Sequence, residues 1–220
     1  VRFGWKFTPF TDPAYFFPKS RIISYLSLRP DGRTVVLDDR IAPPNTFAYY
    51  GIRTVGGYDP LYPKEYTQFL ASIDNGVYSP NITFSRVINP KNLNSSLFRY
   101  LSPTYILSFE PVTGDGITQL MKEGSTILSK NNSSLPLVYF ADSTLYASDS
   151  ASAIEMMKQA SRSAFPAVVT GNIPWDKQTV FGQARIVDSN LEEGSIRLKT
   201  QSDHTGVLVV GEMYAPKWSA

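Results

Sequence analysis

The sequence predicts an α+β fold, with an N-terminal α/β portion around a small mixed sheet and a C-terminal antiparallel β meander or sandwich. Three observations support this prediction. Short helical and strand-like segments alternate up to about residue 170. Beyond residue 178 the apolar residues follow a two-residue period and no helical spacing. Apolar residues make up 42% of the 220 residues, which is enough to bury a core.

The helices are predicted from capping residues and apolar spacing. Ser20 can accept a hydrogen bond from the first turn of a helix that ends near Leu28. Pro63 suits the first position of a second helix and Gly76 its end. The helical segments that we expect, in order, are 20–28, a single turn at 47–50, 63–76, one that Asn92 caps, and one that Ser150 caps.

Strands are predicted where β-branched and aromatic residues cluster between turn residues. Glu123-Gly124 suits a tight hairpin, and residues 131–134 form a polar loop. The expected strands are 33–38, 52–55, 82–88, 105–109, 117–122, 125–130, 135–140, 167–169, 180–189, 195–202 and 206–214. We therefore divide the chain into an α/β portion at 1–170 and a β portion at 171–220 that packs on it.

Charge and residue usage exclude several function classes. The 21 basic and 19 acidic side chains leave a net charge of +2, which excludes a strongly basic nucleic-acid binder. The absence of cysteine excludes thiolate zinc sites, disulfides and cysteine nucleophiles. The single histidine, His204, lies in a turn sequence, where we expect it to be exposed. We expect no metal site and no cofactor.

No part of the sequence is expected to cross a membrane. It contains no run of 18 apolar residues, which is about the length that a transmembrane helix needs. The chain opens at Val1 without a methionine or a signal-peptide pattern and stops at Ala220. We expect it to be a piece of a longer protein.

Five residues form a candidate sugar-binding set. Asn45 lies in one Pro/Gly loop, Tyr58 and Asp59 lie in the next, and Arg40 and Arg53 are near them in sequence. Loops on a rigid scaffold often carry binding residues. A tyrosine ring can stack on a sugar while amide and carboxylate groups bind its hydroxyls. The alternative is that Asn45 and Asp59 form Asx turns and Tyr58 belongs to the core.

Other polar motifs have simpler explanations. Asp38 and Asp39 are consecutive at the end of a strand, so their side chains point to opposite faces and rarely chelate one ion. Gly56-Gly57 is too short to hold a phosphate and predicts a turn. Glycosylation sequons, which are compatible with an outside location, begin at Asn81, Asn94, Asn131 and Asn132.

The chain also resembles a known family through several ordered phrases. They are FGWKFTPF at 3–10 leading to YFFP at 15–18, RIAPPN at 40–45, YGIR at 50–53, GYDPLY at 57–62, Tyr66 in the helix that follows, SPTYIL at 102–107, LPLVYF at 135–140, GVLVV at 206–210 and YAPKW at 214–218. On these the sequence resembles the extracytoplasmic domain of the YfhO-type bacterial membrane proteins, which have a GT-C-like glycosyltransferase architecture. The phrases differ from the family pattern at Leu137, where an arginine is usual, and at Lys217.

This resemblance implies a function that the residues alone do not show. It implies transmembrane helices on both sides of this chain in the full-length protein, and a membrane-anchored domain on the extracytoplasmic side. The catalytic carboxylate of such an enzyme would precede Val1. The domain would then bind or orient a glycan or lipid-linked sugar, or brace the membrane portion, with no catalytic residue of its own.

Two other functions stay open from the sequence. A structural or protein-interaction module would have a flat surface, with exposed aromatic residues and no small-molecule site. A free-standing hydrolase would need two carboxylates in one cleft, with Asp38, Asp59 and Glu110 as the candidates.

Overall fold

The computed structural model describes residues 17–58, 61–82, 87–171, 184–192, 194–213 and 218–219, and its elements form an α+β fold, as predicted. The elements are α2 (Arg21–Ser27), β1 (Arg33–Val36), the 3-10 helix η1 (Thr46–Tyr50), β2 (Gly57–Tyr58), α3 (Lys64–Asn75), β3 (Val87–Ile88), the 3-10 helix η2 (Phe98–Leu101), β4 (Pro103–Ser108), β5 (Ile117–Glu123), β6 (Thr126–Asn131), β7 (Val138–Phe140), β8 (Ser143–Ala147), α4 (Ser150–Gln159), β9 (Pro166–Thr170), β10 (Ala184–Glu192), β11 (Ser195–Ser202) and β12 (Leu208–Val210).

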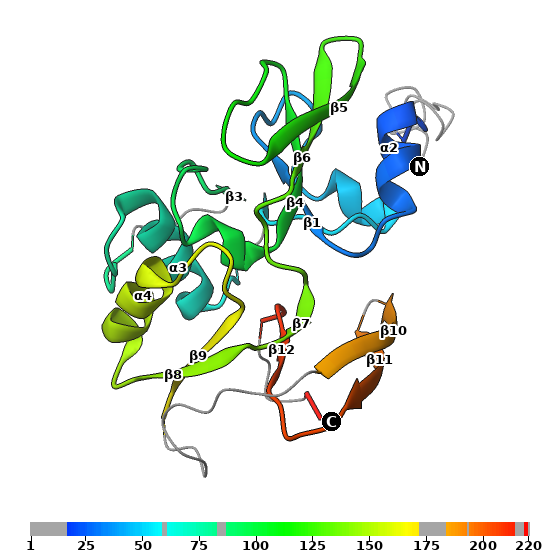
Figure 1. Cartoon of the computed structure of the whole chain (residues 1–220). Coiled ribbons are helices and arrows are strands. Elements are labelled where there is room, and N and C mark those ends of the chain that lie inside the picture. Colours follow the sequence, from blue (N-terminus) through cyan, green and yellow to red (C-terminus); the bar gives the residue numbers. More distant parts are fainter. Residues whose placement is uncertain are drawn as a thin grey trace, which may run out of the picture.

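A mixed four-stranded sheet lies at the centre, in the order β1-β4-β6-β5 (Figure 1). β1 runs parallel to β4, whereas β4 and β5 are both antiparallel to β6. Every residue of β4 is buried, because neighbouring strands and packed segments cover it on all sides. A side chain at Gly32 would meet the Thr104 hydroxyl at 1.9 Å, so the turn before β1 requires glycine.

Helix α2 covers one end of this sheet. The Ser20 side chain accepts a hydrogen bond from the Ile23 amide, as its capping role predicted. The Glu123 carboxylate, at the end of β5, accepts two more hydrogen bonds from the amides of Arg21 and Ile22. A residue distant in sequence therefore completes the cap of a helix that is too short to be stable alone.

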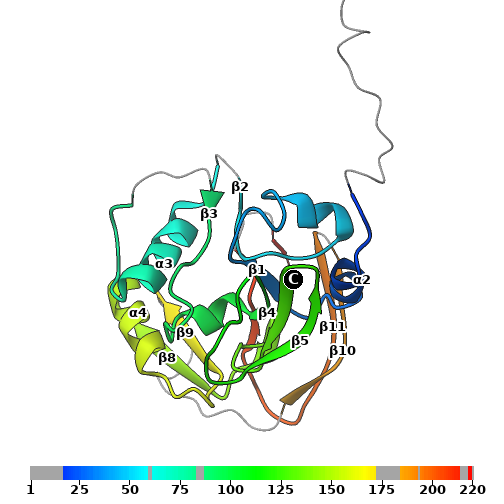
Figure 2. The same ribbon diagram turned by 90° about the horizontal axis from the view of Figure 1, so that it is seen from above.

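Helices α3 and α4 lie together on the opposite side of the molecule from α2 (Figure 2). α3 starts after Pro63 and ends at Gly76, which has a φ of 74°. The predicted cap of α4 was one residue late, because Asp149 accepts the Ser152 amide hydrogen bond and Ser150 is already helical.

The helix predicted after Asn92 is reduced to the four-residue η2. The Asn92 side chain accepts a hydrogen bond from the Asn94 amide, two residues on, so it forms an Asx turn instead of a cap. Ser102, with a φ of 53°, ends η2 directly before β4. Of the strand predicted at 82–88, only β3 is described, and the segment at 52–55 makes a single bridge from Thr54 to Thr34.

The C-terminal strands are antiparallel, as predicted, but they do not form one continuous sheet. β10 pairs with β11, whereas β12 pairs with β7 of the first part of the chain. β8 and β9 form a separate parallel pair, against which α4 packs. The return of β12 to β7 brings residues 207–213 to the centre of the molecule, beside the loops that follow β1 (Figure 1).

Candidate functional site

A cleft of about 930 Å³ lies between the start of α3, the β2 loop and the strands β9 and β12. Its volume lies at the upper end of the range typical of small-molecule sites. Its lining combines tyrosines, aliphatic residues and a few charged side chains. The lining residues include Arg33, Asn45, Val55, Tyr58, Tyr62, Glu65, Tyr66, Phe69, Tyr100, Tyr139, Met157, Val168, Val209, Glu212 and Met213.

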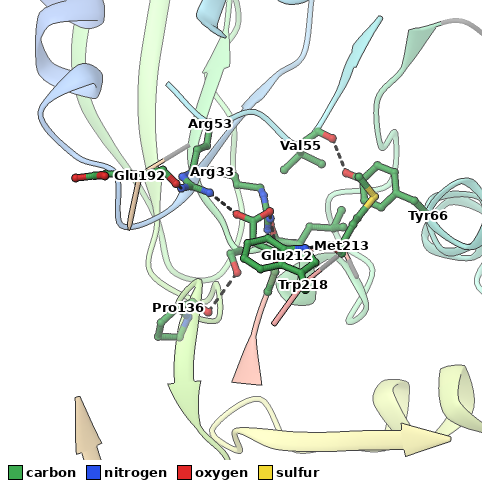
Figure 3. Close-up of polar contacts among 12 residues, drawn as sticks. Arg33, Arg53, Val55, Tyr66, Pro136, Glu192, Glu212, Met213 and Trp218 are labelled. Atoms are coloured by element: carbon green, nitrogen blue, oxygen red, sulfur yellow. Dashed lines mark hydrogen bonds and ion pairs between the residues drawn. The ribbon is translucent and has the colours of Figure 1, made fainter. Parts of the chain in front are cut away.

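Two arginines meet one carboxylate beside this cleft (Figure 3). Arg33 Nη2 donates to Glu212 Oε2 at 3.0 Å, and Arg53 Nη1 donates to Glu212 Oε1. These side chains are only 13%, 22% and 24% exposed for Arg33, Arg53 and Glu212 respectively, so water screens the pairs weakly. Arg33 also donates to the carbonyls of Leu101 and Gly211.

The arginine–glutamate cluster fixes the chain that follows β12. Glu212 is held from β1 through Arg33 and from the loop before β2 through Arg53. The Trp218 indole donates to the Met213 carbonyl at 3.2 Å, and Figure 3 places its ring beside Glu212 and Met213. The cluster therefore holds residues 211–213 against the cleft.

Three tyrosines of the cleft donate their hydroxyls to backbone carbonyls. Tyr66 bonds to Val55 at 2.5 Å, Tyr100 to Met157 at 3.1 Å, and Tyr139 to Pro166 at 3.0 Å. Burial raises the pKa of Tyr66 and of Tyr139 to about 12 and also raises that of Tyr100. These side chains stay neutral at ordinary pH and offer the cleft mainly their rings.

Two of the five predicted binding residues, Asn45 and Tyr58, line the cleft together. The Asn45 amide donates to the Tyr58 carbonyl at 2.6 Å and accepts from the Tyr58 amide at 2.9 Å. A side chain at Gly57 would meet the Asn45 amide oxygen at 2.8 Å, so glycine allows this close approach. The Asn45 side chain thus joins the two loops, and the Tyr58 side chain is 43% exposed.

The other three predicted residues are placed differently. Arg40 is not part of the cleft lining; it pairs with Asp38, two residues away, and lies over the Phe109 ring. Arg53 reaches the cleft only through Glu212. Asp59 lies outside the described residues. The structure therefore brings together Asn45, Tyr58 and, indirectly, Arg53.

The sequence does not predict that Arg33, Glu212 and most of the cleft tyrosines belong to one site. Nothing in the sequence relates Glu212 to Arg33, which precedes it by 179 positions. The sequence places Tyr66 in a helix, and the structure stacks its ring on that of Tyr62.

A second hollow of about 1190 Å³ lies on the other side of Tyr62, and Asp38, Asp39 and Asp74 are among its lining residues. Asp74 accepts hydrogen bonds from the amides of Lys91 and Asn92, and Asp38 is held by Arg40. The Arg40 guanidinium lowers the pKa of Asp38 to about 2. Within the described part of the chain, no three acidic or histidine side chains are grouped to hold a metal ion.

The structure also shows where His204 and three of the glycosylation sequons lie. His204 is exposed in the turn after β11, as expected, where its amide donates to Ser202. Asn131 is only 7% exposed and accepts the Ser133 amide, so the sequon that it begins is unsuitable for a glycan. Asn94 and Asn132 are exposed.

Comparisons with known proteins identify no relative: no family model, curated protein or solved structure matches the chain. In the residues that the structure describes, no helix has both the length and the apolar character that a membrane crossing requires.

Proposed function

We propose that this chain is the extracytoplasmic domain of a polytopic membrane protein that resembles the GT-C glycosyltransferases. In this proposal the domain binds and orients a glycan or lipid-linked sugar, while the chemistry takes place in another part of the protein. Its partners are the transmembrane helices of the same protein. The observation that carries the proposal is the tyrosine-lined cleft between α3, β9 and β12.

The composition of the cleft supports a binding role. Aromatic side chains give large contact area with little loss of conformational freedom, and exposed rings such as that of Tyr58 can stack on a sugar. Arg33 and Glu212 add a polar end that hydrogen bonds hold in place. A site with fixed walls loses less entropy when it binds a ligand.

The two alternatives receive less support. The candidates for a hydrolase were Asp38, Asp59 and Glu110, which would have to share one cleft. Asp38 lies in the second hollow, Glu110 lines neither hollow, and Asp59 lies outside the described residues, so the structure does not bring Asp38 and Glu110 together. A pure interaction module would need no pocket of this size. Exposed apolar residues are nevertheless present. Leu28, directly after α2, is 78% exposed and Tyr49 of η1 is 63% exposed, so such a module would make contact there.

The proposal can be tested through the fluorescence of Trp218. A variant with Trp5→Phe and Trp175→Phe keeps Trp218 as its single tryptophan, beside Met213 of the cleft. We expect a prenyl-phosphate-linked monosaccharide to change this emission in a saturable way. Absence of any change with that lipid and with soluble glycans at millimolar concentration would contradict the proposal.

A matched pair of variants locates the binding site. Tyr58→Ala removes an exposed ring of the cleft but keeps the backbone atoms that Asn45 holds. We expect it to weaken binding about tenfold, since a stacked aromatic contributes roughly 1–1.5 kcal/mol. Tyr49→Ala removes an exposed tyrosine outside the cleft and should leave the affinity unchanged.

A further inference from the structure

The polar groups of the cleft are largely occupied by the protein itself. The hydroxyls of Tyr66, Tyr100 and Tyr139 are all donated to carbonyls. Both ends of the Asn45 amide are bonded to the backbone of Tyr58. A buried group that already has its partner gains little by exchanging it for a ligand hydroxyl. The cleft is therefore less polar than its residue types suggest.

The arginine of the described lining is already paired. Arg33 uses both terminal nitrogens on Leu101, Gly211 and Glu212. Arg53, which lies outside the lining, pairs with Glu212 as well, and Glu65 is a second acidic residue among the described lining residues. The described lining therefore carries one positive and two negative side chains, and it does not attract an anionic group into the cleft.

Much of the remaining surface of the cleft is apolar, although Thr54, Tyr62 and Ser102 also line it. Phe69 and Met157 come from the two helices, and Val168 and Val209 come from β9 and β12. All four residues are half-buried, and all four line the same cleft. Apolar walls of this kind favour a hydrocarbon ligand in proportion to the area that it removes from water.

We infer that the cleft holds the hydrocarbon chain of the lipid-linked sugar, with the sugar at the exposed rim near Tyr58. This inference rests on the proposed function and specifies which part of the ligand the cleft binds. An uncharged chain fits a lining whose arginine is already paired and whose tyrosines present rings. The binding free energy then comes mainly from the lipid chain, and the sugar adds contacts at the edge.

A chain-length series tests this inference with the single-tryptophan protein. The probes are maltose and the octyl, decyl and dodecyl maltosides, each kept below its critical micelle concentration. We expect no binding of maltose and an affinity that rises about fourfold for each added methylene until the chain fills the cleft. Equal affinity for maltose and for dodecyl maltoside would overturn the inference and leave the proposed glycan-binding function standing.

A probe without sugar separates the two proposals further. Binding of dodecylphosphocholine as tight as that of dodecyl maltoside would support the hydrocarbon site and contradict the sugar-binding part of the proposed function. If none of these amphiphiles binds, the inference is wrong.

Two valine variants provide the structural control. Val168→Thr keeps the shape of a cleft residue but adds a hydroxyl, and we expect it to weaken dodecyl maltoside binding about tenfold. Val187→Thr makes the same change on β10, outside the cleft, where Val187 is 50% exposed, and should leave the affinity unchanged. An unchanged affinity of the Val168 variant, with its melting temperature preserved, would contradict a hydrocarbon site at β9.

Discussion

Two arginine–carboxylate clusters of this protein differ in the sequence separation of their partners and in the exposure of their arginines. Arg40 and Asp38 are two residues apart in one loop, and the Arg40 side chain is 79% exposed. Arg33 and Arg53 bind Glu212 across 179 and 159 positions, and all three side chains are less than a quarter exposed. The first cluster closes a turn, whereas the second holds the end of β12 against the first part of the chain.

The difference shows that the burial of an ion pair and the sequence separation of its partners matter more for stability than the number of ion pairs. An exposed local pair is screened by water and gains little, because its partners are already neighbours in the unfolded chain. A partly buried pair is weakly screened, and removal of one partner leaves the other desolvated without a counter-charge. We therefore expect substitutions of the two clusters to have very different effects on stability.

The largest effect is expected for Glu212→Gln. Glutamine keeps the size of the side chain but cannot neutralise Arg33 and Arg53, which remain partly buried. We expect a loss of about 2–3 kcal/mol in the free energy of unfolding, or roughly 5–10 °C in melting temperature. The loss in the free energy of unfolding is measured by urea denaturation, with circular dichroism as the signal.

Glu192→Gln is the matched control for this change. Arg53 contacts only the backbone carbonyl of Glu192, which the substitution keeps. We expect its unfolding midpoint to equal that of the wild type. Equal midpoints for the Glu212 and Glu192 variants would show that the ion pairs of Glu212 do not stabilise the fold.

The same contrast between local and distant contacts decides what the sequence could predict. The Ser20 cap, the Gly76 helix end and the Glu123-Gly124 hairpin are all local features, and the structure contains each of them. The pairing of β12 with β7 could not be predicted, because alternation marks a strand but does not select its partner. The length of the helix after Asn92 was predicted wrongly, because an asparagine side chain accepts a backbone amide hydrogen bond both in a helix cap and in an Asx turn.

The candidate site was predictable only where it depends on neighbouring loops. Asn45 and Tyr58 follow consecutive strand-like segments, so their loops could be expected to meet. Glu212 and Val168 reach the cleft because distant strands return to it, and no local pattern indicates that return. Arg40 was grouped with them by closeness in sequence, but the structure pairs it with Asp38 in the same loop.

An intermediate effect is expected for Glu123→Gln, which weakens a distant contact at an exposed site. The carboxylate of Glu123 accepts the amide hydrogens of Arg21 and Ile22 at 3.0 Å, and these bonds lower its pKa below the ordinary 4.5. We expect a loss of about 0.5–1 kcal/mol near neutral pH. Because the folded pKa is lowered, this stabilisation is present above 4.5 and is lost as the pH falls below that value.

Denaturant unfolding of wild type and variant at several pH values measures this linkage. The difference between the two proteins should shrink as the pH falls from neutral to below the ordinary pKa of glutamate. Glu110→Gln, an exposed glutamate after β4, provides a control with the same change in net charge. A difference that stays constant over this pH range would show that the Glu123 carboxylate does not cap α2.

The smallest effect is expected for Arg40→Ala. This substitution removes the pair with Asp38 and the contact with the Phe109 ring, whose centroid lies 5.3 Å from the guanidinium carbon. Asp38, whose side chain is 28% exposed, still reaches water and keeps the hydrogen bond from the backbone amide of residue 40. It can therefore stay charged without the guanidinium, and the melting temperature should stay within error of the wild type. Arg53→Ala makes the same substitution in the partly buried cluster and should lower the free energy of unfolding by about 2 kcal/mol. Equal losses in the free energy of unfolding for the two variants would contradict this comparison. The Arg40–Asp38 pair would then stabilise the fold as much as the Arg53–Glu212 pair does.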